Sequence, residues 1–288
     1  MAVNNAFDLV TAELDGRVRA YEWVKNVNQV TTAGVWYDLS GASGNPRAKQ
    51  WFDASPLVAQ QIRQSTDGGV YHGADVGGDG FSKYIRGIRA QCVSATPLPM
   101  SLILCDYLIY YPSIEDGNLD LQLMDNTLTL PRAVSGEGVQ MMAVTISART
   151  GGQSFFVNYT NSDGVPGRVS STVVQNAVAS PGSITTSATA VQGGAQPFIG
   201  LQSGDRGVRS VQSVQMLGAD TGFFAIVLVK PLASSQIRGI DAVYDKDLFI
   251  MQNECPKVDD DAYLSLLALP NGSLSGLAVR GNLRVVWN

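Results

Sequence analysis

The stretch SLILCDYLIYY, from Ser101 to Tyr111, limits the possible folds more than any other part of the chain. A bilayer-spanning helix needs roughly 20 consecutive apolar residues, and this run is shorter, holds a carboxylate and ends at Pro112. Its dense Leu, Ile and Tyr side chains are typical of a strand covered on both faces. We therefore predict a central core strand in which Asp106 is hydrogen-bonded within or beside the sheet, because a buried carboxylate needs a partner.

Strand-like patterns also fill most of the rest of the chain. From Phe81 onward, segments with strand patterns follow one another at intervals of roughly ten to fifteen residues, with turn signals between them. Alternation of apolar and polar residues in VRSVQSVQML and VTISAR favours antiparallel strands with one packed face and one wet face. These patterns predict an all-β protein, an antiparallel two-sheet β-sandwich, and they leave a jelly-roll topology open.

Two exceptions interrupt this β pattern. The segment DASPLVAQQIRQ predicts one short helix near residues 56–64, because Ser55 can cap it and Pro56 suits its first turn. The glycine-rich segment that follows, residues 65–80, is the best place for a boundary. We predict an N-terminal arm or subdomain over residues 1–67 and a sandwich body over residues 68–288.

The charge pattern excludes some classes of partner. The net charge is −5, and the lysines and arginines are scattered rather than clustered as a phosphate-binding surface requires. We therefore expect no direct binding to nucleic acid and no binding to an anionic membrane. The start of the chain lacks the pattern of an export or organelle signal. The three cysteines, Cys92, Cys105 and Cys255, are odd in number and widely spaced, which predicts buried thiols rather than disulfides or a zinc site.

Two acidic segments could hold a metal ion. The single histidine, His72, lies near Asp75 and Asp79 among glycines, but no EF-hand spacing is present and the Gly/Asp pattern occurs once. We expect an ordinary flexible loop and no metal, with a calcium ion near Asp75 and Asp79 left open. The segment KVDDDAY, residues 257–263, is expected to be a solvated loop, because successive carboxylates alternate in direction along an extended chain.

No catalytic motif is found. The chain has no G-x-S-x-G, no Walker-type loop and no metalloprotease helix, and a Ser-His-Asp triad could use only His72. A glycosidase with two distant carboxylates stays open at this stage. We predict that the protein is not an enzyme, with no catalytic residues and no cofactor.

Four aromatic residues near the N-terminus are candidates for an interface. Arg17 to Lys25 reads as a strand in which Tyr21 and Trp23 share one face, and Trp36 and Tyr37 follow in the next strand candidate. Such aromatics could anchor a neighbouring subunit. The alternative is that Tyr21, Trp23, Trp36 and Tyr37 close the sandwich core.

Several phrases resemble structural proteins of tailed-bacteriophage virions. They are VRSVQSVQMLGADTGFFAIVLVKPL, DAYLSLLALPNGSLSG and LRVVW near the C-terminus, with LILCDYLIYYPSIEDG and NTLTLPRAVSGEGVQMMAVTIS before them. The resemblance covers most of residues 84–288. It implies a β-rich particle protein that is made in the infected bacterial cytoplasm and incorporated in many copies, and it supplies no catalytic residues.

These observations lead to one functional hypothesis with alternatives. We expect a non-enzymatic virion protein, a head decoration or minor capsid protein that binds and stabilises the shell. Its partners would be copies of itself and the phage major capsid protein or another virion protein. A tail or collar component is the alternative within this class. A carbohydrate-binding β-sandwich used in host attachment, or a hydrolase of surface glycans, would show exposed aromatics on a concave face, and Trp51 and Phe52 are candidates.

Overall fold

A computed structural model of the chain describes residues 3, 5–76, 80–176, 178–185, 196–240, 243–252 and 254–288. Strands dominate, and the pairings within the sheets are antiparallel. The predicted all-β, sandwich-type fold is thus confirmed. The strands fall into three main sheets. A single jelly roll has eight strands in two sheets, so it does not describe the whole chain.

The first sheet, here called the terminal sheet, contains the first and last strands of the chain. Its order is β17-β5-β20-β1-β3, and β18 pairs with the first two residues of β5. Its central strands β1, β5 and β20 are ten or eleven residues long and pair over long registers. The strands are β1 (Val18–Val27), β3 (Ser43–Asn45), β5 (Lys83–Cys92), β17 (Tyr244–Asp247), β18 (Lys257–Val258) and β20 (Leu277–Trp287).

The second sheet, the central sheet, has the order β14-β8-β16-β6-β19-β2, with β4 beside β6. The predicted core strand lies in its middle as β6, between β16 and β19, which confirms that prediction. The strands are β2 (Tyr37–Asp38), β4 (Gln60–Gln61), β6 (Met100–Glu115), β8 (Gln140–Thr145), β14 (Ile184–Thr185), β16 (Phe223–Ile237) and β19 (Tyr263–Leu269).

The third sheet, the distal sheet, has the order β11-β10-β15-β7, with β12 also on β10. In β10 every second side chain is buried, so one face of this strand packs into the core. The strands are β7 (Gln122–Leu123), β10 (Ser154–Asn161), β11 (Arg168–Val169), β12 (Val173–Val174) and β15 (Val208–Met216); β9 (Arg149–Thr150) and β13 (Val178–Ala179) form a separate pair.

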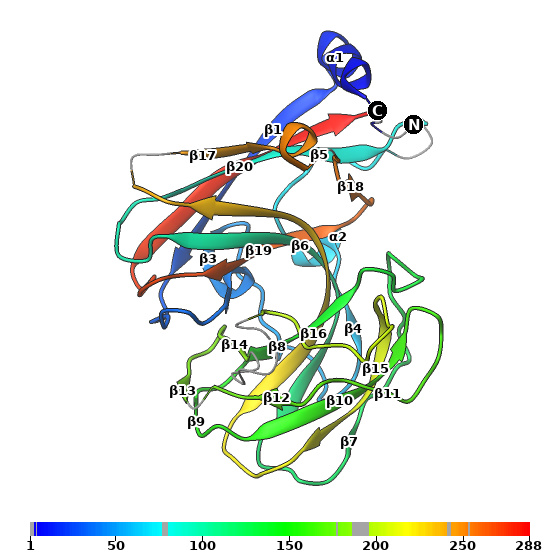
Figure 1. Cartoon of the computed structure of the whole chain (residues 1–288), viewed down its shortest axis with the longest axis vertical. Coiled ribbons are helices and arrows are strands. Elements are labelled where there is room, and N and C mark those ends of the chain that lie inside the picture. The colour runs from blue at the N-terminus through cyan, green and yellow to red at the C-terminus, as the bar shows by residue number, and fades with distance from the viewer. Residues whose placement is uncertain are drawn as a thin grey trace.

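The two long strands β6 and β16 belong to two sandwiches at once. Figure 1 shows the sandwiches one above the other along the long axis, with β6 and β16 passing from one to the other. The first part of β6 packs Leu102 and Leu104 against the terminal sheet. After a β-bulge, Ile109 and Tyr111 pack against the distal sheet. The predicted two-sheet sandwich is therefore present twice, and both copies share the central sheet.

A third apolar cluster covers the other face of the central sheet. Trp51 stacks on Tyr107 at a centroid distance of 5.6 Å and lies edge-on to Tyr110 at 5.3 Å. The buried carboxylate of Asp38 accepts hydrogen bonds from the Trp51 indole at 2.6 Å and the Tyr107 hydroxyl at 2.7 Å. These polar contacts satisfy a charge that would otherwise be costly to bury.

The described helices are short and lie at the ends of the sheets: α1 (Ala6–Leu14), α2 (Gln64–Asp67) and α3 (Leu248–Gln252), with a 3₁₀ turn η1 (Leu39–Gly41). The helix predicted near residues 56–64 is wrong, because this segment is a turn followed by β4. Its backbone N–H groups donate outward instead, Leu57 to Pro112 and Ala59 to Asp125. The Asn5 cap and Asp8 begin α1, which the sequence analysis missed. Within the described residues, no helix is long and apolar enough to span a bilayer.

Residues 1–67, predicted as an N-terminal arm or subdomain, contribute strands to the terminal and central sheets. β1 pairs with β20 from Val18 to Val27, while β2 pairs with β19 and β4 with β6. The boundary after residue 67 therefore does not separate one sheet system from another.

The position of Trp23 leads to a stability prediction. Its side chain is buried in the core between the terminal and central sheets, whereas Tyr21, two residues earlier on β1, is only half-buried. We expect Trp23→Ala to lower the free energy of unfolding by about 3–5 kcal/mol and Tyr21→Ala by under about 1 kcal/mol. Urea unfolding followed by circular dichroism measures both values. Equal small losses would show that Trp23 is not part of the core.

Candidate functional site

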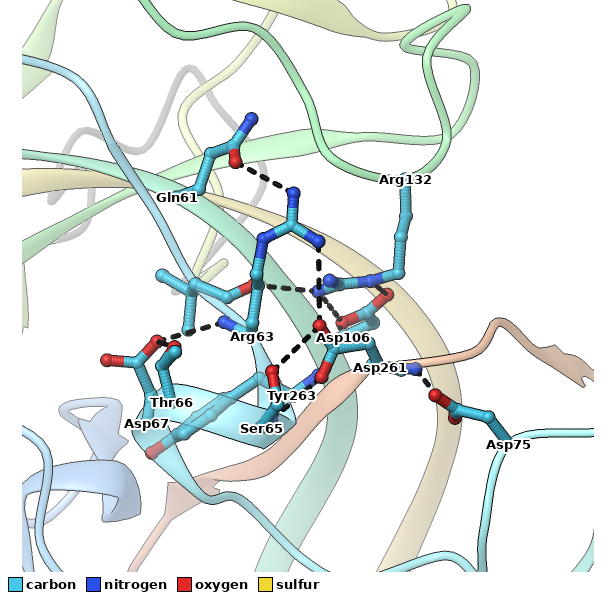
Figure 2. A network of polar contacts seen from close by, with 12 residues as sticks. Gln61, Arg63, Ser65, Thr66, Asp67, Asp75, Asp106, Arg132, Asp261 and Tyr263 are labelled. Atoms are coloured by element: carbon cyan, nitrogen blue, oxygen red, sulfur yellow. Dashed lines mark hydrogen bonds and ion pairs between the residues drawn. The ribbon is translucent and has the colours of Figure 1, made fainter.

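The carboxylate of Asp106 lies where one sandwich core ends and the next begins. Arg132 binds it with two hydrogen bonds, Nε to Oδ2 at 3.0 Å and Nη2 to Oδ1 at 2.8 Å, and both side chains are buried (Figure 2). Nη2 of Arg132 also donates to the carbonyl oxygens of Ile62 and Tyr107. The predicted hydrogen bonding of Asp106 is confirmed, and Arg132 joins it to the backbone of two segments, at Ile62 and at Tyr107.

The pKa of Asp106 is set by burial and by the ion pair with Arg132. Burial raises the pKa of the Asp106 carboxyl above its ordinary value, while the Arg132 guanidinium opposes the rise. The backbone N–H of Tyr263 donates a further hydrogen bond to Oδ1 at 3.1 Å. The carboxylate is thus fully engaged by the scaffold. The sequence indicated that Asp106 needs a partner, but no local signal identified Arg132.

The aspartate-rich segment of residues 257–263 connects this junction to the neighbouring loops. The Oδ1 atom of Asp261 accepts the backbone N–H of Ser65 at 2.7 Å, and its Oδ2 lies 3.5 Å from Arg63 (Figure 2). Asp260 lies 3.3 Å from the buried ammonium of Lys83. The solvated-loop prediction is wrong for Asp260 and Asp261, because each bridges to a distant segment.

His72, expected in a flexible loop, is instead completely buried. Its Nε2 lies 2.9 Å from the carbonyl oxygen of Ala262, and its Nδ1 lies 3.2 Å from the Lys83 ammonium. A carbonyl can only accept and an ammonium can only donate, so the neutral tautomer with hydrogen on Nε2 fits. Burial and the charge of Lys83 lower the pKa of His72 to about 4.

The calcium site left open near Asp75 and Asp79 has only one described residue. Asp79 lies outside the described residues. Oδ1 of Asp75 accepts hydrogen bonds from Lys83 at 3.2 Å and from the backbone N–H of Asp261 at 3.0 Å. In the described part of the chain, no group of three or more His, Cys, Asp or Glu side chains is arranged to hold a metal ion.

An open groove with aromatic walls lies next to this network. It forms beside the start of β1, where Arg19 is exposed and Tyr21 is half-buried, while Trp23 further along the same face is buried. The groove has a volume of roughly 490 Å³, within the size range of small-molecule sites. Its lining includes Arg17, Arg19 and Tyr21 from β1 and its approach, Tyr71 and Asp75 from the following loops, and Phe81 and Trp287.

The rings in the groove stand at steep angles to one another. Tyr21 lies edge-on to Tyr71 at 5.0 Å and to Trp287 at 6.4 Å. Burial and the neighbouring Tyr71 raise the pKa of Tyr21, so its hydroxyl stays protonated at neutral pH. Gly73 has a positive φ of 91°, and a Cβ there would lie 2.5 Å from the Trp287 ring. The loop therefore packs directly onto the ring and holds the wall in place.

The four predicted interface aromatics separate into two groups. Trp23, Trp36 and Tyr37 are buried inside the chain and close its cores, which was the alternative interpretation of these residues. They offer no surface to a neighbour, so the interface prediction is corrected for these three. Tyr21 alone reaches the groove. The alternation of β1 could identify this face, but Tyr71 and Trp287 carried no sequence signal.

The aromatic pair expected to be exposed, Trp51 and Phe52, is also divided. Trp51 is buried against the central sheet, and Phe52 is 51% exposed. The three cysteines are buried free thiols, as predicted. Burial raises the pKa of the Cys105 thiol well above its ordinary value.

Comparison with known proteins adds little to this geometry. No protein-family model and no curated protein matches the sequence. A chain from the structure of the infectious bursal disease virus Gx strain is similar over 94% of this chain and 80% of its own length, at 9% identity and a TM-score of 0.16. A TM-score this low carries no argument. The resemblance to phage virion proteins therefore stays a prediction.

The burial of His72 predicts a pH dependence of stability. Its pKa is about 4 in the folded chain against an ordinary 6.5, so the unfolded state binds more protons between these values. The contribution of His72 to the free energy of unfolding is therefore fully present above pH 6.5 and is lost as the pH drops toward 4. The total loss is about 3 kcal/mol, at 1.36 kcal/mol per pKa unit. Urea unfolding at several pH values, compared between wild type and His72→Gln, measures this.

Because the chain has one histidine, its imidazole NMR signals can be followed without ambiguity. We expect them to titrate near pH 4 in the folded protein. A midpoint near 6.5, or an unfolding profile that His72→Gln leaves unchanged, would contradict the buried neutral imidazole.

Proposed function

We propose that this chain is a non-enzymatic structural protein of a virion, most simply a head decoration or minor capsid protein that binds the outer shell. One observation carries the proposal. The groups that could perform chemistry are bonded to the scaffold: Asp106 to Arg132, Asp261 to Ser65, and His72 to Ala262 and Lys83. Because these side chains bind other parts of the same chain, they support a structural role for the protein.

The body also suits a reinforcing subunit. Strands of 16 and 15 residues, β6 and β16, run through both sandwiches and join them without a linker. Charged residues make up only 16% of the chain, as suits a surface that is partly covered by neighbours. The resemblance to phage virion proteins names the neighbours: copies of this chain, and the major capsid protein or another virion protein.

Helix α1 presents an apolar face that supports assembly. Leu9 and Ala12 pack onto the terminal sheet, whereas Phe7, Val10 and Leu14 are exposed on the other side of the helix. Exposed apolar residues at helical spacing are typical of contact surfaces. Figure 1 shows α1 at one end of the molecule, beside both termini. We propose that this end contacts the shell, with a ring or trimer around a local symmetry axis.

Light scattering of the purified protein, alone and mixed with undecorated phage heads, tests this function. We expect a discrete oligomer that saturates the heads at a symmetric stoichiometry. Phe7→Ser with Leu14→Ser should abolish head binding. Leu217→Ser, which changes a residue that is equally apolar and 56% exposed on the distal sandwich, should not.

A monomer that ignores heads would contradict the decoration role. Binding to purified tails or collars instead would move the protein to the alternative location in the particle. Loss of binding in the Leu217→Ser control alone would place the contact at the other end of the body.

A further inference from the structure

We propose that the groove between β1 and the loop of residues 71–76 binds a neutral glycan, with Tyr71 as the stacking platform. The inference does not depend on the chain being a virion component. It rests on the shape of the groove, on its exposed rings, and on two polar groups that the scaffold holds fixed.

The surface around Tyr71 is hollowed on more than one side. Its ring is 53% exposed and borders two hollows, the groove of roughly 490 Å³ and a second hollow of roughly 420 Å³. Ala74 and Asp75 also border both hollows. The tyrosine therefore stands as a ridge between two adjoining spaces. Such a ridge fits a chain of at least two sugar rings better than a single compact ligand.

The walls of the groove combine aromatic rings with polar groups. A pyranose ring has an apolar face of C–H groups and a rim of hydroxyls, so it needs flat apolar contacts and hydrogen-bonding groups at the edges. Tyr71 supplies the exposed ring face, the 42% exposed Phe81 adds apolar surface with one of its faces under Arg17, and Tyr21 adds a hydroxyl. Aromatic side chains with a polar atom suit sites where one side is apolar and the other is wet.

The scaffold holds two polar groups of the groove, on Arg19 and Asp75, in fixed positions. Nη1 of Arg19 donates to the carbonyl oxygens of Gly16 at 2.6 Å and Val18 at 2.8 Å, which leaves Nε and Nη2 without partners among the described residues. Oδ1 of Asp75 is held by Lys83 and Asp261, and its Oδ2 has no hydrogen bond in the described part of the chain. One fixed donor and one fixed acceptor can serve the hydroxyl groups of a sugar.

The charges favour a neutral ligand over an anion. Arg17 is paired with Asp15 at 2.9 Å and lies over the Phe81 ring at 4.8 Å, so its charge is largely compensated. Arg19 is then the one groove cation without an ion pair to a described residue, and the carboxylate of Asp75 faces the same groove. A phosphate or nucleic-acid site needs several converging cations, which this groove does not offer.

Saturation-transfer NMR on the full chain tests the proposal. The probes are the methyl glycosides of glucose, galactose, mannose and N-acetylglucosamine, trisaccharides of each sugar, and glucuronate and inorganic phosphate for comparison. We expect transfer to the ring protons of at least one neutral sugar, with the trisaccharide binding more tightly than its methyl glycoside.

Variants locate the site. Tyr71→Ala should weaken binding about tenfold or more, as removal of a stacking ring does, whereas Tyr71→Phe should retain it. Phe52→Ala removes an aromatic ring of similar exposure outside the groove and should leave binding unchanged. Circular dichroism confirms that each variant is folded before it is titrated.

Three results would overturn the inference. The first is no transfer from any neutral sugar at millimolar concentration. The second is binding of glucuronate or phosphate without binding of neutral sugars, which would make the groove an anion site. The third is binding that survives Tyr71→Ala. Head binding by the same preparation is measured separately, so failure of the glycan site leaves the structural role untouched.

Discussion

The contact between Arg132 and Asp106 is the interaction on which the arrangement of the two sandwiches depends. It lies at the point on β6 where apolar contacts with the terminal sheet end and those with the distal sheet begin. Two cores that share a sheet leave a gap where their covering layers part, and polar backbone groups at that gap need partners. Arg132 supplies them by binding Asp106 and two carbonyl oxygens together. Removal of one member of such a buried pair costs about 3–5 kcal/mol.

The groove lies at the margin of the core between the terminal and central sheets, where Tyr21 and Trp287 pack against buried residues. Along β1, side chains of one face pass from the core at Trp23 to the groove wall at Tyr21 and Arg19. The polar network behind the groove then fixes its loop: Lys83 holds Asp75 and His72, and Asp261 ties the loop to β19. Scaffold and binding surface are therefore products of one packing arrangement, and the proposed structural and glycan-binding roles can coexist on it.

Local patterns predicted the strands but not their partners. The apolar run of β6 and the alternation of β1 identified a core strand and placed Tyr21 and Trp23 on one face, since both depend on side-chain period alone. The partner of Asp106 lies 26 residues away with no local signal, and the part of β1 that is buried is set by residues from other strands that pack against it. The helix predicted near residues 56–64 failed because tertiary hydrogen bonds to Pro112 and Asp125 outweigh local capping preference.

We expect the two sandwiches to unfold as a single cooperative body, because β6, β16 and the Asp106–Arg132 contact join them. Differential scanning calorimetry of the full chain tests it most directly, because the ratio of calorimetric to van 't Hoff enthalpy counts cooperative units. A single transition with a ratio of about 1 is the result that the shared sheet and buried ion pair require. Two separate transitions, or a ratio of about 2, would show that the sandwiches unfold independently and would contradict the claim.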